Sequence, residues 1–170
     1  MSAPRLILPS QLLVESLVLL DVAAESKKRV FEEISLAVEN ADGPNRGKVF
    51  SSLLDRERLG STMIQRGVAI PHAKVDDLAA PIVAYLRAKE PFQYDGPEDR
   101  VKHLFVLLAP DKASDIHLKI LSIMSRILSD GVFIEAADAC ADRRGMLRLI
   151  ADWERRSLPP NILDGSAAAG

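Results

Sequence analysis

His72 is the residue of this sequence whose type and surroundings best suit nucleophilic chemistry. It follows the short apolar run at residues 68–70 and Pro71. Such a run predicts a buried strand, and Pro71 restricts both its own φ and the backbone of the residue before it. The imidazole is therefore expected to leave the strand in a rigid pose, as a side chain that can be neutral, nucleophilic or cationic near neutral pH. The same X-Pro-His pattern also occurs in plain loops, so the local pattern leaves a packing role open.

Two other histidines and one arginine occupy different contexts. His117 falls in the first turn of a predicted helix, where unpaired N–H groups and a partial positive charge favour anions. It is either a donor to an incoming phosphate or an exposed histidine at a helix start. Arg56 closes a predicted helix, and its guanidinium is either a bidentate partner for phosphate oxygens or a solvated charge. His103 lies inside the apolar run 101–108 and is expected to be structural or solvent-facing.

Two further patterns do not lead to a site. The segment GPNRGK at residues 43–48 is one residue short of a phosphate-binding loop, and Val49 stands where that loop needs Ser or Thr. The histidines and Cys140 lack the paired spacing of zinc ligands, so no metal site is predicted. Nothing in the sequence identifies a catalytic pair of carboxylates.

Composition and charge are those of one globular domain. The 170 residues are 48% hydrophobic and 27% charged, and the net charge of −2 offers no basic surface for nucleic acid. Cys140 is the single cysteine, which excludes an internal disulfide and favours a half-buried or buried thiol in a reducing compartment. The N-terminus lacks a secretory pattern, and no apolar stretch reaches the roughly 18 residues of a membrane span. We therefore predict a cytoplasmic protein without membrane insertion.

The elements that must position Arg56 are predicted from the residues before it. Residues 18–20 form a candidate strand. Ser26 is a candidate N-cap for a helix over Lys27–Asn40, along which apolar residues recur at helical spacing. A cluster of helix-breaking residues at 40–45 then separates this helix from a second, short one that ends near Arg56.

The elements after His72 continue the mixture of strands and helices. Nearly unbroken apolar runs predict strands at residues 82–86 and 101–108, with a loop at 91–97 between them. Ser114 or Asp115 is expected to cap a long helix. The helices predicted in this half of the chain cover residues 116–129, 132–139 and 143–155. Strands mixed with helices predict an α/β fold with a sheet covered on both faces.

The run RERLGSTMIQRGVAIPHAK at residues 56–74 closely resembles the active-site signature of the IIA proteins of the bacterial phosphoenolpyruvate-dependent phosphotransferase system. More narrowly, it resembles the nitrogen-regulatory branch, which is related to the fructose and mannitol IIA domains. The similarity extends to residues 26–28, 79–84 and 104–110, and to the LKILS helix. The resemblance implies a type-2 IIA domain over residues 10–156, folded as a three-layer α/β/α sandwich with a central mixed β-sheet. The tail at 157–170, with two prolines and little apolar content, is predicted to be flexible.

The resemblance also implies a role for each matching residue. His72 aligns with the phosphoryl acceptor, His117 with a second active-site histidine and Arg56 with the active-site arginine. Ser61 and Thr62 belong to the same motif, where they would contact phosphate or simply shape the loop. The implied donor is a histidine-containing phosphocarrier protein, and neither a cofactor nor a metal is expected.

The chain departs from the usual family pattern at a few positions. Met63 and Gln65 stand where glycines are usual, and Ala73 replaces a frequent glycine. Lys102 stands where an acidic residue is common. These departures are expected to alter loop flexibility or partner choice and to leave the phosphorylation site intact.

Three functions are compatible with the resemblance. The first is a regulatory phosphocarrier that controls target proteins, such as potassium transporters or sensor kinases, through its phosphorylation state. The second is a fructose- or mannitol-type IIA component that passes phosphate to a IIB domain. The third is an interaction module with an inactive site, against which the joint presence of His72, His117 and Arg56 argues. A monomer or weak homodimer is expected.

Overall fold

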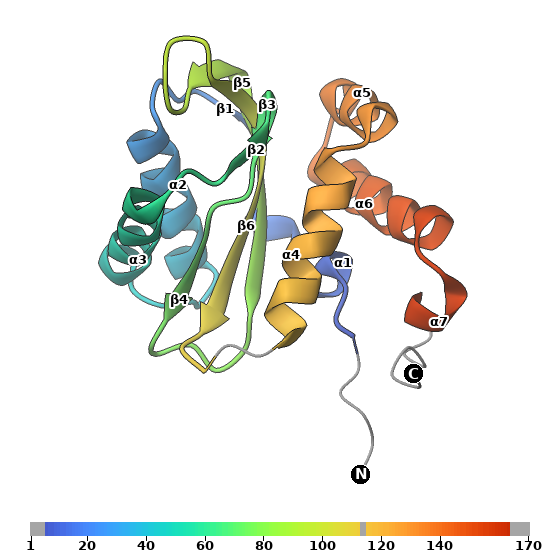
Figure 1. Cartoon of the computed structure of the whole chain (residues 1–170), viewed down its shortest axis with the longest axis horizontal. Coiled ribbons are helices and arrows are strands. Elements are labelled where there is room, and N and C mark those ends of the chain that lie inside the picture. The colour runs from blue at the N-terminus through green and yellow to red at the C-terminus, as the bar shows by residue number, and fades with distance from the viewer. Residues whose placement is uncertain (1–5, 113–114, 164–170) are drawn as a thin grey trace.

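Residues 6–112 and 115–163 are described by the computed structural model of this chain, in which helices and strands are mixed along the sequence. The helices are α1 (Pro9–Leu12), α2 (Lys27–Asn40), α3 (Arg46–Leu59), α4 (Asp115–Leu128), α5 (Gly131–Ala139), α6 (Arg143–Ser157) and α7 (Pro160–Leu163). A short 3-10 helix at Glu15–Leu17 precedes the first strand. Figure 1 shows α2 and α3 on one side of a central sheet and α4 and α6 on the other. The predicted three-layer α/β/α sandwich is confirmed.

Six strands form one mixed sheet in the described part of the chain. They are β1 (Val18–Val22), β2 (Met63–Gln65), β3 (Gly67–Ala69), β4 (His72–Val75), β5 (Ile82–Gln93) and β6 (Arg100–Pro110). Their order is β1-β5-β6-β3-β2, and β4 also pairs with β6. The β1–β5, β3–β6 and β4–β6 pairs are parallel, whereas β5–β6 and β2–β3 are antiparallel. The sheet is therefore mixed, as expected.

β3 and β4 follow one another along the same edge of β6, with a break at Ile70 and Pro71. Pro71 has no N–H to donate to a neighbouring strand. The Ile70 N–H donates instead to the Thr62 carbonyl at 2.9 Å. The edge of the sheet is thus interrupted immediately before His72, which begins β4.

The two helices that cover one face of the sheet begin where the local sequence predicts. Ser26 caps α2 and Asn45 caps α3, because each accepts a backbone N–H with its side-chain oxygen. The predicted bounds of α2 are confirmed. α3 is longer than predicted and extends to Leu59, before Gly60, so Arg56 lies inside its last turn. None of the helices in the described residues combines the length and the apolar content needed to cross a membrane.

The core lies on both faces of the two central strands. Residues 83–88 of β5 and 103–109 of β6 are buried, as expected for apolar runs covered by helices on either side. β5 is longer than predicted, because residues 91–93, expected in a loop, continue the strand beyond an irregularity between Arg87 and Phe92. The ring of Phe92 is buried, and this burial holds the segment against β6.

The segment that the sequence predicts as a flexible tail begins as ordered structure. α6 runs to Ser157, Leu158 is buried, and the apolar residues of α7 pack against the body of the protein. This corrects the prediction for residues 157–163, whose apolar side chains were too few to reveal the packing. Residues 164–170 lie outside the described part of the chain.

Candidate functional site

A cavity of about 590 Å³ opens between the end of α3, the start of β4 and the start of α4. Arg56, His72 and His117 all line it, so side chains far apart in the sequence share one space. A neighbouring cavity of about 370 Å³ is also lined by Arg56 and His72, together with Ser61 and Thr62. The fold thus gathers all five residues predicted for the site around two cavities that share Arg56 and His72.

His72 is the first residue of β4 rather than a residue that leaves β3 in a loop. The carbonyl of Pro71 accepts a hydrogen bond from the Leu107 N–H at 3.1 Å, which anchors the backbone on β6. The Nδ1 atom of His72 lies 2.9 Å from the Ile70 carbonyl oxygen. Because a carbonyl only accepts, Nδ1 carries the proton in the neutral ring and Nε2 keeps the lone pair. Nε2 is therefore the ring nitrogen whose lone pair is available to an electrophile.

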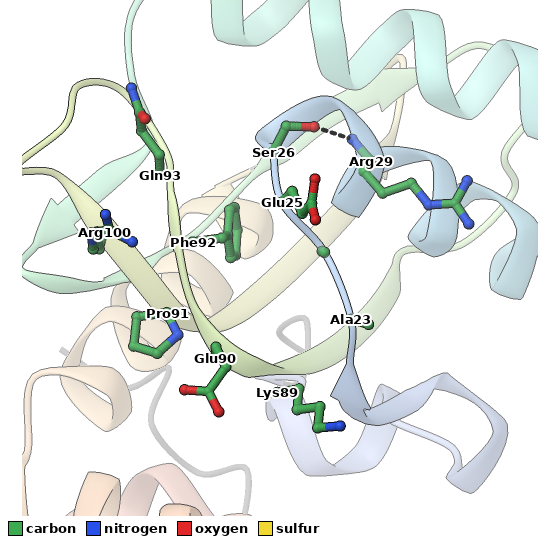
Figure 2. A pocket seen from close by; sticks show the side chains of 11 residues that line it. Ala23, Glu25, Ser26, Arg29, Lys89, Glu90, Pro91, Phe92, Gln93 and Arg100 are labelled. Atoms are coloured by element: carbon green, nitrogen blue, oxygen red, sulfur yellow. Dashed lines mark hydrogen bonds between the residues drawn. The ribbon is translucent and has the colours of Figure 1, made fainter.

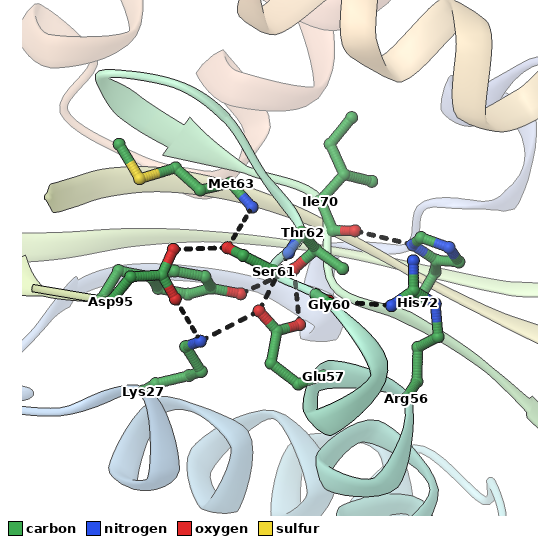
Figure 3. Close-up of polar contacts among 11 residues, drawn as sticks. Lys27, Arg56, Glu57, Gly60, Ser61, Thr62, Met63, Ile70, His72 and Asp95 are labelled. Atoms are coloured by element: carbon green, nitrogen blue, oxygen red, sulfur yellow. Dashed lines mark hydrogen bonds and ion pairs between the residues drawn. The ribbon is translucent and has the colours of Figure 1, made fainter.

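Arg56 reaches the same space from the last turn of α3. Its Nη1 donates to the Gly60 carbonyl at 2.9 Å, and Figure 3 shows its guanidinium close to the His72 ring. Arg58 pairs with Asp55, but no carboxylate of the described residues forms an ion pair with Arg56. The half-buried guanidinium keeps donors that can bind an anion beside His72.

His117 lines the cavity from the first turn of α4 and is only 8% exposed. The alternative of an exposed histidine at a helix start is therefore wrong. Its burial depends on the sheet and on α3 lying opposite, which helical spacing alone does not reveal. Ser114, one of the two predicted caps, lies outside the described residues, and Asp115 is the first residue of the helix.

The hydroxyls of Ser61 and Thr62 are engaged with other protein groups. Thr62 Oγ1 donates to Glu57 at 2.7 Å and accepts from the Tyr94 hydroxyl at 2.8 Å. Ser61 donates to Asp95. Of the two roles left open by the sequence, these contacts fit the shaping of the loop, since neither hydroxyl proton is available to a phosphate.

A lysine and two acidic residues that the sequence analysis did not single out hold this loop (Figure 3). Lys27 Nζ lies 3.1 Å from Glu57 Oε1 and 2.7 Å from Asp95 Oδ1. Burial acts to raise the pKa of the Asp95 carboxyl, but hydrogen bonds from Lys27 and Ser61 outweigh it and lower the pKa. In the sequence, the one feature that could have drawn attention to Glu57 is its place beside Arg56 in the motif. Its burial depends on partners far apart in the chain.

Another cavity, of about 720 Å³, lies between the start of α2, the end of β5 and the start of β6. Figure 2 shows side chains of both charge signs around it, Glu25 and Arg29 beside α2 and Glu90 and Arg100 on the strands. None of the five predicted site residues lines it. Exposed charges of mixed sign favour no particular ligand.

His103 and Cys140 line neither of the two cavities around His72. His103 is buried, and its ring joins the Tyr85 hydroxyl at 2.6 Å to Asp138 at 2.7 Å. Burial lowers the pKa of His103, against the raising effect of Asp138. Of the two roles predicted for His103, the structural one is confirmed. Cys140 is half-buried, and the described residues contain no group of His, Cys, Asp or Glu that could hold a metal ion.

The chain is similar to known proteins over most of its length. Residues 11–153 match the family model for the phosphoenolpyruvate-dependent sugar phosphotransferase system, EIIA 2. The chain is 31% identical over 159 residues to a nitrogen regulatory protein of Bradyrhizobium diazoefficiens, covering 93% of each. It is 38% identical over 96 residues to a PTS system fructose-specific EIIA component of Haloferax volcanii, covering 56% of this chain and 62% of that protein. The crystal structure of nitrogen regulatory protein IIA-Ntr from Neisseria meningitidis matches with a TM-score of 0.77 at 32% identity, over 83% of this chain and 97% of that one.

Proposed function

The chain belongs to the EIIA 2 family of the phosphoenolpyruvate-dependent sugar phosphotransferase system, and we propose that it is a regulatory phosphocarrier phosphorylated on Nε2 of His72. The donor is a histidine-containing phosphocarrier protein. One observation carries the proposal: the 2.9 Å contact between His72 Nδ1 and the Ile70 carbonyl. It leaves the lone pair on Nε2, in a ring that lines a cavity together with Arg56 and His117.

The transfer requires one bond to form and one to break. The Nε2 lone pair of His72 attacks the phosphorus, and the P–N bond of the donor phosphohistidine breaks, returning an electron pair to the donor nitrogen. The proton on Nδ1 stays in its hydrogen bond to Ile70. Phosphoryl transfer depends mainly on alignment and on positive groups that offset the charge of the phosphoryl oxygens. Arg56 supplies a positive charge and His117 an imidazole N–H, from two different helices.

Exposed leucines at the mouth of the cavity suit a protein as donor. Leu59 on α3 is 86% exposed and Leu118 on α4 is 66% exposed, and both line the cavity. Large apolar side chains that remain exposed beside a polar site are typical of protein–protein contacts. A donor that covers both leucines would also exclude water from the phosphoryl group.

Similarity to nitrogen regulatory proteins over nearly the full length supports a regulatory role. Phosphate on His72 adds negative charge at the rim of the cavity and changes which partners can bind there. The targets expected from the family resemblance are potassium transporters and sensor kinases. The similarity to a fructose-specific EIIA component supports a second candidate, in which His72 passes the phosphoryl group to a IIB domain.

Labelling with phosphoenolpyruvate and the upstream carrier proteins tests the proposal. Wild-type protein should gain an acid-labile, alkali-stable phosphate, and His72→Ala should gain none because the acceptor nitrogen is lost. His117→Gln is the matched control and should still be labelled, more slowly. Label that survives His72→Ala would refute the assigned site, and wild-type protein that takes no label would favour the interaction module.

A second stage separates the two phosphocarrier roles. Purified labelled protein is mixed with a fructose-type IIB domain, and the label on each protein is followed with time. Retention of label on His72 supports the regulatory role. Rapid transfer to the IIB domain supports the sugar-delivery role instead.

A further inference from the structure

Glu57 places a buried carboxylate directly beside Arg56, in the last turn of α3. Its side chain is only 4% exposed. The carboxylate accepts from the Thr62 N–H at 3.0 Å, from the Thr62 hydroxyl at 2.7 Å and from Lys27 Nζ at 3.1 Å. A buried carboxylate is costly unless its oxygens are hydrogen-bonded, and here both oxygens are. Glu57 thus ties α3, α2 and the turn at residues 60–62 together.

The turn that Glu57 holds is the same turn that orients Arg56. The Gly60 N–H donates to the Glu57 backbone carbonyl at 3.2 Å, and the Gly60 carbonyl accepts from Arg56 Nη1 at 2.9 Å. A shift of the turn would therefore move the acceptor that holds the guanidinium. Figure 3 shows Glu57 below the turn and Arg56 reaching past it toward His72.

The same turn is also linked to His72. Thr62, which Glu57 holds by both its N–H and its hydroxyl, accepts from the Ile70 N–H at 2.9 Å. The Ile70 carbonyl in turn accepts from His72 Nδ1 at 2.9 Å. One chain of hydrogen bonds therefore leads from the buried carboxylate through Thr62 and Ile70 to His72. The turn that the same carboxylate holds also carries the Gly60 carbonyl that accepts from Arg56.

We propose that Glu57 is a positioning residue for phosphoryl transfer. It does not touch the phosphoryl group; it holds the turn at residues 60–62 so that Arg56 and the Nε2 of His72 are aligned before the donor arrives. The inference rests on the proposed transfer to His72. A displacement of about 1 Å at a reacting group costs on the order of 100-fold in rate, so a loosened turn is expected to slow transfer.

Glu154 provides a matched control for the loss of a buried carboxylate. It lies in α6, is fully buried, and accepts from the Ser10 N–H at 3.0 Å and from the Ser10 hydroxyl. None of its hydrogen bonds leads to His72 or Arg56. Glu57→Gln and Glu154→Gln both replace a buried carboxylate with an amide of the same shape, but only the first affects the turn.

The test measures the rate of phosphoryl transfer from the phosphorylated histidine phosphocarrier protein, with phosphoenolpyruvate as the phosphate source. The temperature is one at which circular dichroism shows that each variant is folded. Glu57→Gln should lower the maximal single-turnover rate constant on the order of 10- to 100-fold, with the donor concentration that gives half of this rate nearly unchanged, and Glu154→Gln should leave both unchanged. The Nδ1–H resonance of His72 should shift in Glu57→Gln and not in Glu154→Gln. Equal kinetics and equal resonances in the two variants would overturn the proposal.

Thr62 supplies an independent arm in case Glu57→Gln does not fold. Thr62→Val removes the hydroxyl that donates a hydrogen bond to Glu57, and Thr62→Ser retains a hydroxyl at this position. We expect slow phosphoryl transfer in Thr62→Val and a rate close to that of the wild type in Thr62→Ser. Equal rates in the two variants would contradict the positioning role of the hydrogen bonds between Glu57 and Thr62. Wild-type protein that takes no label would instead refute the proposed function itself.

Discussion

At the scale of single residues, backbone carbonyls orient the two side chains proposed to meet the phosphoryl group, His72 and Arg56. The Ile70 carbonyl accepts from His72 Nδ1, and the Gly60 carbonyl accepts from Arg56 Nη1, each at 2.9 Å. A carbonyl only accepts, so the first contact determines which ring nitrogen of His72 is free to react. Groups held in place beforehand need little reorganisation when charge develops, which is how such sites lower a reaction barrier.

Substitution of Arg56 tests its contribution to transfer. Arg56→Gln removes the positive charge beside His72 and should slow phosphorylation on the order of 100-fold, the usual effect of losing one stabilising donor. Arg56→Lys should recover part of the rate, because an ammonium keeps the charge but cannot bond Gly60 and a phosphoryl oxygen with one planar fork. Initial rates of labelling measure both effects.

Arg58 is the control for that experiment. It lies two residues away on the same helix, is exposed, and pairs with Asp55 instead of lining the cavity. Arg58→Gln should be labelled at the wild-type rate. A loss as large as that of Arg56→Gln would mean that the general charge of α3, and not Arg56, assists the transfer.

At the scale of elements, the junction between α2 and α3 leaves no space for a side chain at Gly43. A Cβ at this position would lie 2.6 Å from Val38 Cγ1 and 2.7 Å from the Val38 carbonyl oxygen. The Gly43 N–H also donates to that carbonyl at 2.9 Å. This close approach sets how α3 leaves α2, and the other end of α3 carries Arg56 and Glu57.

Gly43→Ala should destabilise the protein because backbone atoms must move to accept the methyl group. We expect the free energy of unfolding to fall by about 1–3 kcal/mol, as in other overpacked sites. Urea unfolding followed by circular dichroism measures the change. Gly131→Ala is the control, since a Cβ there meets no atom within 4 Å and alanine suits the first residue of α5. Equal stability of the two variants would contradict the close approach at Gly43.

At the scale of the whole molecule, buried polar side chains join the end of α5 to the central strands. Arg87 of β5 donates to the carbonyls of Ala137 at 2.8 Å and Cys140 at 2.7 Å. His103 of β6 contacts Asp138 at 2.7 Å. These contacts hold α5 to the sheet through residues that line neither cavity around His72.

The buried His103 should make the stability of the protein depend on pH. Burial lowers its pKa below the value of about 6.5 in an unfolded chain. Between the two pKa values the unfolded state binds a proton that the folded state does not, so the free energy of unfolding decreases as pH falls below about 6.5. The slope contributed by this one group is at most about 1.4 kcal/mol per pH unit.

Comparison of wild type with His103→Gln isolates this contribution. Urea unfolding at about pH 7.5 and at about pH 5.5 should give a larger loss of stability on acidification in the wild type, because glutamine does not titrate. Burial raises the pKa of Glu154, but that group is present in both proteins and its effect cancels. An equal loss in the two proteins would show that His103 does not titrate as expected.

The sequence by itself determined the features that depend on neighbouring residues. The bounds of α2 follow from the Ser26 cap and from helical periodicity, and the burial of β6 follows from its unbroken apolar run. The motif also singled out Arg56 and His72, and the predicted helix start and the family resemblance singled out His117; these three residues line one cavity in the fold. Such features are readable because caps, periodicity and motifs act over a few residues.

Only the tertiary structure decided what surrounds those residues. Burial of His117 requires three elements to meet. The contacts around Glu57 include the ion pair of Lys27 with Asp95, which lies 68 residues further along the chain. From sequence alone, Pro71 is compatible with a loop that continues through His72. In the fold, the residues after Pro71 pair with β6, and His72 is therefore the first residue of a strand. Contacts between segments far apart in the chain leave no periodic trace in sequence, so the alignment of Arg56 with His72 became visible only once the chain was folded.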